Sequence, residues 1–223
     1  VTFADGADLI TASAGTSNFR AGVNAGNSIQ SGGNSNTVVG DEAGTAITTG
    51  VFNTFIGETA GDALTVGTRN VSLGQGSLTS DTLGSRSVAV GQGALNNQNF
   101  TTATDTYNVA VGNAAGGQVT TGTQNTYIGG LAGDAATSSV ENVAVGYQAL
   151  SADTLGSKSV AVGRMALLSQ NLTTATDVYN VAVGHNAGQQ ITTGVQNTLI
   201  GGLAGDALTV GVRNVALSAN ALS

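Results

Sequence analysis

A segment of about 17 residues recurs along almost the whole chain, and this recurrence limits the possible fold more than any other feature. Each unit begins with Asn or Ser, continues with a short apolar alternation and reaches Gly, as in "NTYIGGLAG" at residue 125 and "NVAVGHNAG" at residue 180. A unit this short cannot bury a core alone, so it must stack on its neighbours. Twelve units start at residues 18, 36, 53, 70, 87, 108, 125, 142, 159, 180, 197 and 214.

The units form groups of four, because every fourth unit from residue 36 onward is longer than the other three. The long units "SVAVGQGALNNQNFTTATDTY" at residue 87 and "SVAVGRMALLSQNLTTATDVY" at residue 159 match closely. Two units of each group end their first half in Gly (Gly-type) and two in Leu (Leu-type). The chain therefore divides into a lead-in or linker, 1–17, and a repeat domain, 18–223, with super-repeats 36–107, 108–179 and a partial 180–223.

Within a unit, numbered from its first residue as position 0, the pattern predicts one short β-strand. Val or Thr at position 1 and Val, Ile or Leu at position 3 alternate with a residue that is mostly Ala at position 2, which is typical of a strand. Gly at position 4 permits a positive φ, and Ala at position 7 indicates a tight contact. Thr-rich segments such as "QVTTGTQ" predict a second short strand in Gly-type units, and no segment has a helical period.

We therefore expect an all-β parallel β-solenoid of about 12 coils, with about 17 residues per coil and about 21 in every fourth. At about 4.8 Å per coil, the rod would be on the order of 55 Å long. The Asn at position 0 is expected to stack on its copies in a hydrogen-bonded ladder; the alternative is a solvated turn residue.

Composition excludes several functions. The chain has 34 Gly, one His and no Pro, Cys or Trp, so it can form neither a disulfide nor a thiolate metal site. A net charge of −7 with scattered basic residues argues against a nucleic-acid partner. No run of about 18 apolar residues is present, so we expect no membrane insertion. We also expect no cofactor.

If positions 1 and 3 point into the solenoid, each coil buries only a few aliphatic side chains. We expect such a core to be too small to stabilise a single chain. Position 2 would then lie on the outer face, where Ala or a larger apolar residue such as Phe55, Tyr127 or Leu199 would need cover. An identical chain is the simplest cover, so we expect an intertwined or side-by-side homotrimer that shelters the alanine face.

The motifs "NVAVG", "SVAVG" and "NTFIG" resemble the head repeats of YadA-type trimeric autotransporter adhesins, and "NTxIGxxAGxxxTTG" resembles bacteriophage tail fibres. The resemblance covers residues 18–223. It implies three chains in a bundle of left-handed parallel β-rolls with a surface-exposed, filamentous and adhesive role. The units are longer than those of the adhesin heads, and their Gly- and Thr-rich style is closer to viral fibre shafts. The resemblance thus implies an extracellular location on a virion tail, or alternatively on a bacterial cell surface.

The long units hold the one break in regularity. Insertions in repeat proteins fall on one face, which is often the binding face. We therefore interpret the insertions as candidate contacts with a host-surface receptor, either glycan or protein; the alternative is a bulge that packs between chains. The expected tips are Asn99, Phe100, Asn171 and Leu172.

No arrangement of residues indicates catalysis or a metal site, so we expect no enzyme. His185 is interpreted as a surface turn residue. Solvated turn carboxylates are expected at Asp62, Asp134 and Asp206, with cation binding between subunits as the alternative. Asp81 and Asp153 are interpreted as turn formers in "DTLG". The cations before the next unit are expected to pair with carboxylates of adjacent coils; they are Arg69, Arg86, Lys158 and Arg213.

The leading hypothesis is the structural shaft of a trimeric extracellular fibre, of the bacteriophage tail-fibre kind, that supports host-receptor binding. A bacterial trimeric adhesin head is the second hypothesis. An ice-binding solenoid is disfavoured because "TT" recurs only every fourth unit, at 48–49, 120–121 and 192–193. A tailspike glycanase with hidden carboxylates is the fourth. Because the last unit ends within a coil, at "NVALSANALS", flanking fibre domains are expected to follow.

Overall fold

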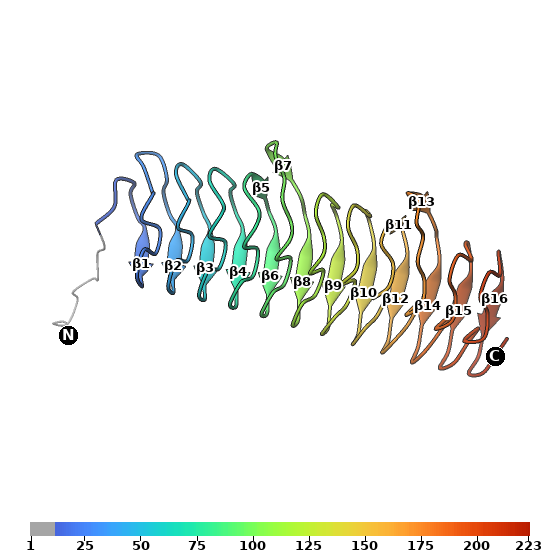
Figure 1. Ribbon diagram of the computed structural model, residues 1–223. Coiled ribbons are helices and arrows are strands. Elements are labelled where there is room, and N and C mark those ends of the chain that lie inside the picture. Colours follow the sequence, from blue (N-terminus) through green and yellow to red (C-terminus); the bar gives the residue numbers. More distant parts are fainter. Residues whose placement is uncertain (1–11) are drawn as a thin grey trace, which may run out of the picture.

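The computed structural model describes residues 12–223 as a rod of stacked coils (Figure 1). Of the predicted lead-in, residues 1–11 lie outside the described residues. Twelve three-residue strands form one parallel sheet along the rod, and the described residues contain no helix. The all-β parallel solenoid is thus confirmed. The strands are β1 (Phe19–Ala21), β2 (Thr37–Val39), β3 (Thr54–Ile56), β4 (Val71–Leu73), β6 (Val88–Val90), β8 (Val109–Val111), β9 (Thr126–Ile128), β10 (Val143–Val145), β12 (Val160–Val162), β14 (Val181–Val183), β15 (Thr198–Ile200) and β16 (Val215–Leu217).

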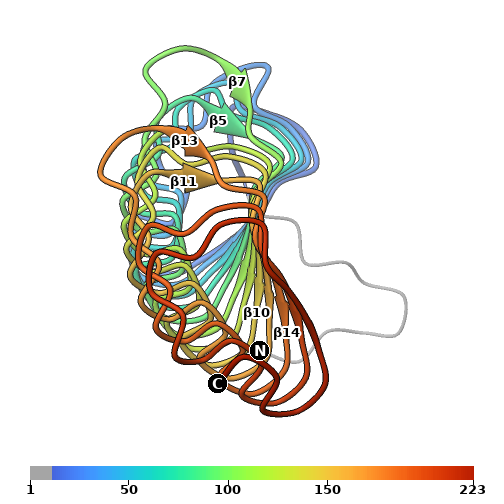
Figure 2. The ribbon, with the colours of Figure 1, turned by 90° about the vertical axis from the view of Figure 1, so that its right-hand side faces the viewer.

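The coils stack with every equivalent position aligned. In β9 and β10, Thr126 pairs with Val143 and Ile128 with Val145, so positions 1 to 3 lie directly above one another. The turns are hydrogen-bonded between coils as well, since Gly146 N donates to Ile128 O at 2.7 Å and Gly133 N to Ala149 O at 3.0 Å. Viewed along the rod, the coils superimpose with a gradual rotation (Figure 2). Stacking of both strands and turns explains why the length of the unit is so regular.

Additional strands form at the long coils rather than in the Gly-type units. The two-residue β5 (Gly84–Ser85) pairs with β7 (Thr104–Asp105), and β11 (Gly156–Ser157) with β13 (Thr176–Asp177). The second strand predicted for Gly-type units is absent among the described residues. In its place, Thr120 donates to Thr137 O through both its N–H and its hydroxyl, at 2.8 and 3.1 Å. Gly122 N donates to the same carbonyl oxygen at 3.3 Å, so the coils meet here at one acceptor and form no strand ladder.

The interior of the solenoid is lined by position 2, not by positions 1 and 3 as expected from the sequence. Ala144 has no exposed surface, whereas Val143 and Val145 are half-buried on the outer face of the sheet. The interior is narrow, because positions 2 and 7 of one coil touch: Ser72 and Ser77 share an Oγ–Oγ hydrogen bond of 2.5 Å. Only small side chains fit both positions in most coils. The prediction that the alanine face shelters against sister chains is therefore wrong.

Each coil supplies about one large side chain to this narrow core, from a position that depends on its type. Leu-type coils bury the Leu at position 8, such as Leu150 and Leu167. Gly-type coils bury an aliphatic residue at position 11 or a large residue at position 2, and the Gly at position 8 leaves room for it. A Cβ on Gly133, for example, would lie 2.4 Å from the ring of Tyr127. The alternation of Gly and Leu along the sequence is thus a packing pattern.

The predicted Asn ladder is confirmed. Asn125 Nδ2 donates to Ser139 O in its own coil at 2.9 Å, and its Oδ1 accepts from the backbone N–H of Asn142 in the next coil at 3.0 Å. The backbone N–H of Asn125 in turn donates to Asn108 Oδ1 at 3.0 Å. All three Asn residues are buried, so each side chain satisfies backbone groups that water cannot reach.

Gly at position 4 forms a second ladder, in which backbone meets backbone. Gly129 has φ of +129°, and a Cβ added to it would lie 2.5 Å from the carbonyl oxygen of Gly146 in the next coil. A side chain has no space there, because the contact is with main chain that cannot rotate away. The recurrence of Gly at this position is therefore required by the spacing of the coils.

Candidate functional site

The long coils project from one edge of the rod, where β7 and β13 lie (Figure 1). Two of the four expected tip residues are misplaced: Phe100 and Leu172 are only 5% and 7% exposed. Their side chains turn inward because each is the apolar residue that closes the end of the coil. Asn99 and Asn171 are exposed, and their Oδ1 atoms accept hydrogen bonds from Thr82 and Thr154. The exposed tips are 101–103 and 173–175 instead.

A buried polar network underlies each long coil. Gln98 Nε2 donates to Asp81 Oδ2 at 2.6 Å and to Ser87 Oγ at 2.8 Å, and Gln98 Oε1 accepts from Asn108 Nδ2 at 2.9 Å. Ser87 stands where other coils have Asn, so Gln98 supplies the side-chain carbonyl that the ladder would otherwise lack. The same network recurs around Gln170, Asp153, Ser159 and Asn180. The insertion therefore has a structural role inside the rod.

Asp81 forms the predicted turn, but it is a buried part of this network and not a solvated residue. Its Oδ1 accepts from the backbone N–H of Gly84 at 3.0 Å and of Phe100 at 3.2 Å. Burial raises the pKa of Asp81 above its ordinary value, and the hydrogen bonds from Gln98, Phe100 and Gly84 offset part of this effect. The network therefore holds a carboxyl group whose charged form is disfavoured by its surroundings.

This raised pKa predicts the sign of one contribution to pH-dependent stability. Because the folded pKa of Asp81 lies above the unfolded value, its contribution to the unfolding free energy is fully present below the unfolded pKa and is lost as pH rises through the folded pKa. Urea unfolding from about pH 3.5 to 7.5 should show a smaller decrease in Asp81→Asn than in the wild-type chain, because the Asp81 contribution is removed and that of Asp134 remains.

Asp177→Asn is the control with the opposite sign. The ion pair with Lys158 lowers the pKa of Asp177, so its contribution is present above the unfolded pKa and is lost as pH falls through the folded pKa. An Asp81→Asn variant whose pH profile parallels that of the wild type would contradict the assignment.

Exposed clusters of a cation, a carboxylate and an aromatic ring flank both insertions. Arg86 Nε lies 2.9 Å from Asp105 Oδ2, and the guanidinium lies 5.6 Å from the ring centre of Tyr107. In the second copy, Lys158 Nζ lies 2.7 Å from Asp177 Oδ2 and 5.5 Å from the centre of the Tyr179 ring. The predicted pairing with carboxylates is thus confirmed for two of the four cations. Arg69 instead lies 5.3 Å from the centre of the Phe52 ring, and Arg213 Nε donates to Gln196 Oε1 at 2.8 Å. Because the groups are exposed, each cluster adds little stability.

The remaining candidate residues form no site together. His185 is exposed, with Nε2 at 3.4 Å from Arg164 Nη1. Asp62 accepts a hydrogen bond from Thr79. Asp134 and Asp206 each have one buried carboxylate oxygen with no hydrogen-bond partner among the described residues, so the prediction that they are solvated is wrong. Burial raises the pKa of Asp134. Residues 12–223 contain no group of three or more His, Asp or Glu that could hold a metal ion.

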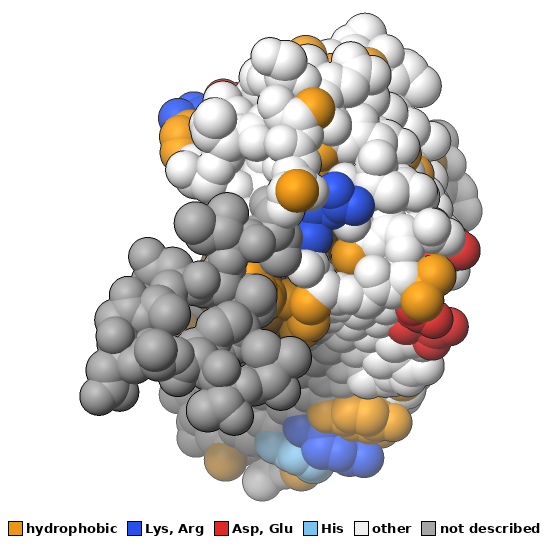
Figure 3. All heavy atoms as spheres, turned by 90° about the vertical axis from the view of Figure 1, so that its left-hand side faces the viewer, with side chains coloured by type: hydrophobic (Ala, Val, Ile, Leu, Met, Phe, Trp, Pro, Cys, Tyr) orange, Lys and Arg blue, Asp and Glu red, His pale blue; other side chains and the backbone are white. Residues whose placement is uncertain are grey.

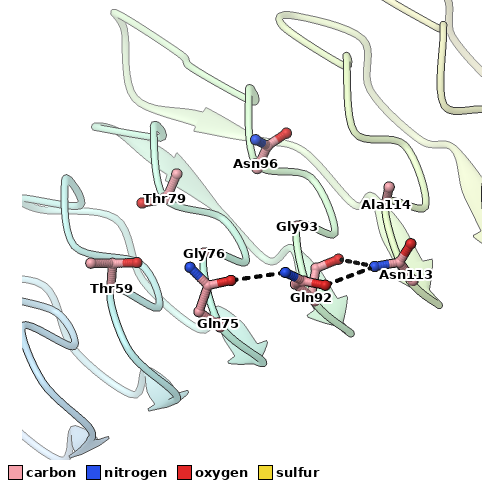
Figure 4. A pocket seen from close by; sticks show the side chains of 9 residues that line it. All are labelled: Thr59, Gln75, Gly76, Thr79, Gln92, Gly93, Asn96, Asn113 and Ala114. Atoms are coloured by element: carbon pink, nitrogen blue, oxygen red, sulfur yellow. Dashed lines mark hydrogen bonds between the residues drawn. The ribbon is translucent and has the colours of Figure 1, made fainter.

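One groove, of about 480 Å³, crosses the turns that follow β4, β6 and β8 (Figure 4). It was not foreseen from the sequence. It arises where two consecutive coils have Gly at position 6, Gly76 and Gly93, while the other coils carry a side chain there. The lining residues are Thr59, Gln75, Gly76, Thr79, Gln92, Gly93, Asn96, Asn113 and Ala114.

The lining of the groove is neutral and polar, and two carboxylates lie beside it. Glu58 is exposed at the position that Gln75 has in the next coil, and Asp62 accepts a hydrogen bond from Thr79. No charged side chain lines it, and the end of the rod seen in Figure 3 is likewise mostly uncharged. Along one side, Asn113 Nδ2 donates to Gln92 Oε1 at 3.1 Å, and Gln92 Nε2 donates to Gln75 Oε1 at 3.1 Å. These amides form an ordered row that presents donors and acceptors to a ligand.

No protein-family model, curated protein or solved structure matches this chain. Among the described residues there is no helix long and apolar enough to span a membrane.

Proposed function

We propose that the chain forms the structural shaft of a homotrimeric extracellular fibre, of the bacteriophage tail-fibre kind, which supports binding to a host receptor. The role is mechanical rather than catalytic. It rests on a rod whose coils are hydrogen-bonded to one another in both strands and turns, and on the repeat motifs that resemble such fibres. A left-handed coil, as in the β-rolls of those proteins, is part of the proposal.

The observation that carries the trimer is the outer face of the 12-stranded sheet. Positions 1 and 3 form two parallel rows of Val, Ile, Leu and Thr, with Phe19 and Ala21 in the first coil, and no charged residue interrupts them. Ile56, Ile128 and Ile200, which occupy equivalent coils of successive super-repeats, are 43%, 38% and 42% exposed. Single soluble chains rarely expose a continuous apolar surface this long.

Identical chains are the partners that fit this face best. A second copy has the same coil spacing, so the apolar rows of two copies match along their whole length. The absence of charge along both rows means that close contact desolvates no ion. The partner face is thus the Val and Ile face, and not the alanine face that lines the core.

The experiment measures the mass of the chain in solution at several dilutions. We expect a species near 65 kDa, three times the mass of the 21.7 kDa chain. Changing Ile56, Ile128 and Ile200 together to Lys should give a folded monomer, because each side chain is partly exposed and Lys can extend into water.

Tyr147→Lys is the matched control, because Tyr147 is exposed outside the two rows. It should remain a trimer. A wild-type chain that is monomeric at every concentration, or a triple variant that still forms a trimer, would refute the proposed interface.

Receptor contact is proposed for the exposed loop tips, 101–103 and 173–175, together with Asn99 and Asn171. These tips project from the edge of the rod, so a receptor can reach them without displacing a coil. Flanking fibre domains would continue the rod.

A further inference from the structure

The groove beside Gln92 is not a requirement of the fold. A Cβ added to Gly76 or Gly93 would meet no atom within 4 Å, so neither glycine is needed for packing. Their φ angles of +64° and +66° are also adopted by side chains at the same position elsewhere, since Gln148 has φ of +55° and Met165 of +57°. The two glycines thus open a surface that the repeat otherwise covers.

The next super-repeat provides an internal comparison. At its equivalent coils, the scaffold residues Asn or Ser at position 0 and Gly at position 4 are retained, but every lining residue of the groove is different. Small and amide side chains are replaced by bulky, aromatic or basic ones: Gln75 corresponds to Tyr147, Gly76 to Gln148, Gln92 to Arg164, Gly93 to Met165 and Asn113 to His185. One copy of the same scaffold is therefore open and neutral, and the other is filled and basic.

Several polar atoms at the groove are left for a ligand. Gln75 Nε2, at one end of the amide row, and Asn113 Oδ1, at the other, have no hydrogen-bond partner among the described residues. Asn96, across the groove, makes no side-chain hydrogen bond there either. Each amide offers both a donor and an acceptor, which is the pair of functions that neighbouring sugar hydroxyls require.

We infer that this groove binds a neutral oligosaccharide through hydrogen bonds to Gln75, Gln92, Asn96 and Asn113. Its volume of about 480 Å³ lies within the range of about 300 to 1,000 Å³ that is usual for small-ligand sites. An anionic ligand is disfavoured because no cation lines the groove and Asp62 is hydrogen-bonded to Thr79 at its edge. An extended peptide is disfavoured because the groove offers neither a free strand edge nor an apolar pocket.

The groove is open and lacks an aromatic platform, so each site is expected to bind weakly, with a dissociation constant on the order of 1 mM. If three chains assemble as proposed above, their grooves would act together and raise the apparent affinity for a glycan-coated surface. The site itself is complete within one chain, so its test does not depend on the trimer.

The test uses the biotinylated chain bound to labelled streptavidin, so that several weak sites act together whatever mass the chain has in solution. This complex is applied to a printed array that carries neutral hexose and N-acetylhexosamine oligosaccharides beside sialylated and sulfated ones. We expect retention on a subset of the neutral glycans. The double variant Gly76→Gln with Gly93→Met fills the groove with the residues of the second copy, and it should lose binding by at least about tenfold. Its circular dichroism spectrum should stay unchanged, because the second copy accommodates both side chains. Its thermal midpoint should fall only by the conformational cost of two side chains at positive φ, with the unfolding transition still cooperative.

Two further variants separate the amide chemistry from the available space. Gln92→Met keeps a similar volume but removes the amide, and it should also weaken retention. Gln148→Ala with Met165→Ala alters the same positions outside the groove and should bind as the wild type does. Absence of retention on every neutral glycan, retention only on acidic ones, or full retention by the filled variant would overturn the inference, whatever mass the chain has in solution.

Discussion

Gly129→Ala is expected to lower the unfolding free energy by about 3–6 kcal/mol, although it adds only one methyl group. Gly129 has φ of +129°, which an Ala adopts at high cost, and the new Cβ would lie 2.5 Å from the carbonyl oxygen of Gly146. The coils cannot separate to relieve this contact, because Gly146 N also donates to Ile128 O at 2.7 Å. Urea unfolding followed by circular dichroism measures the loss.

The control is Gly93→Ala, which also places Ala at a positive φ. Gly93 has φ of +66° and open space around its Cβ, so only the conformational cost of about 1–2 kcal/mol remains. Equal losses in the two variants would mean that the close approach between coils does not limit this position.

Asn125→Ala is expected to lower the unfolding free energy by about 2–5 kcal/mol. The change removes the partners of two buried backbone groups, the N–H of Asn142 and the carbonyl of Ser139. Neither group can turn to water, because both residues are buried. Thermal and urea unfolding of the variant measure the effect.

Gln190→Ala is the control, because it removes a side-chain amide that is not part of the Asn ladder. Gln190 is exposed and its side chain makes no hydrogen bond within residues 12–223, so the expected change is within about 0.5 kcal/mol. If Asn125→Ala lowers the unfolding free energy by no more than this, the Asn ladder does not contribute measurably to stability.

The sequence predicted the coil length, the strand positions and the Asn ladder because these depend on periodicity alone. A stacked array with a fixed spacing must place Asn108 above Asn125, whatever the shape of the coil. The Gly ladder was likewise indicated by a residue that almost never varies at its position.

The orientation of the strand could not be predicted in the same way. The alternation Val143, Ala144, Val145 predicts that the two valines lie on the same face of the strand. It does not predict whether that face points into the solenoid or away from it. The width of the interior decides this, and it depends on contacts between positions 2 and 7, as at Ser72 and Ser77. We expected the larger apolar side chains of positions 1 and 3 to fill the core. The coil is too narrow for them, and its interior holds mostly the alanine of position 2.

The candidate sites were harder to predict, because they depend on residues brought together from different coils. Gln98 is unremarkable in sequence, yet it bridges Asp81, Ser87 and Asn108. One signal was present: Ser replaces Asn at position 0 only in the two long units. The groove left a fainter signal, since it arises from missing side chains at Gly76 and Gly93 in adjacent coils.

The recurrence of Ile56, Ile128 and Ile200 has a consequence for two copies laid side by side. At position 3 six of the twelve coils present Val and two present Leu, whereas Ile occurs only in these three, at the same coil of each super-repeat. Sliding one copy by a single coil would set each isoleucine against a different neighbour, and the original match returns only after four coils, on the order of 20 Å. The three isoleucines thus favour one register between adjacent rods. A lengthwise shift by fewer than four coils would lose their matched contacts.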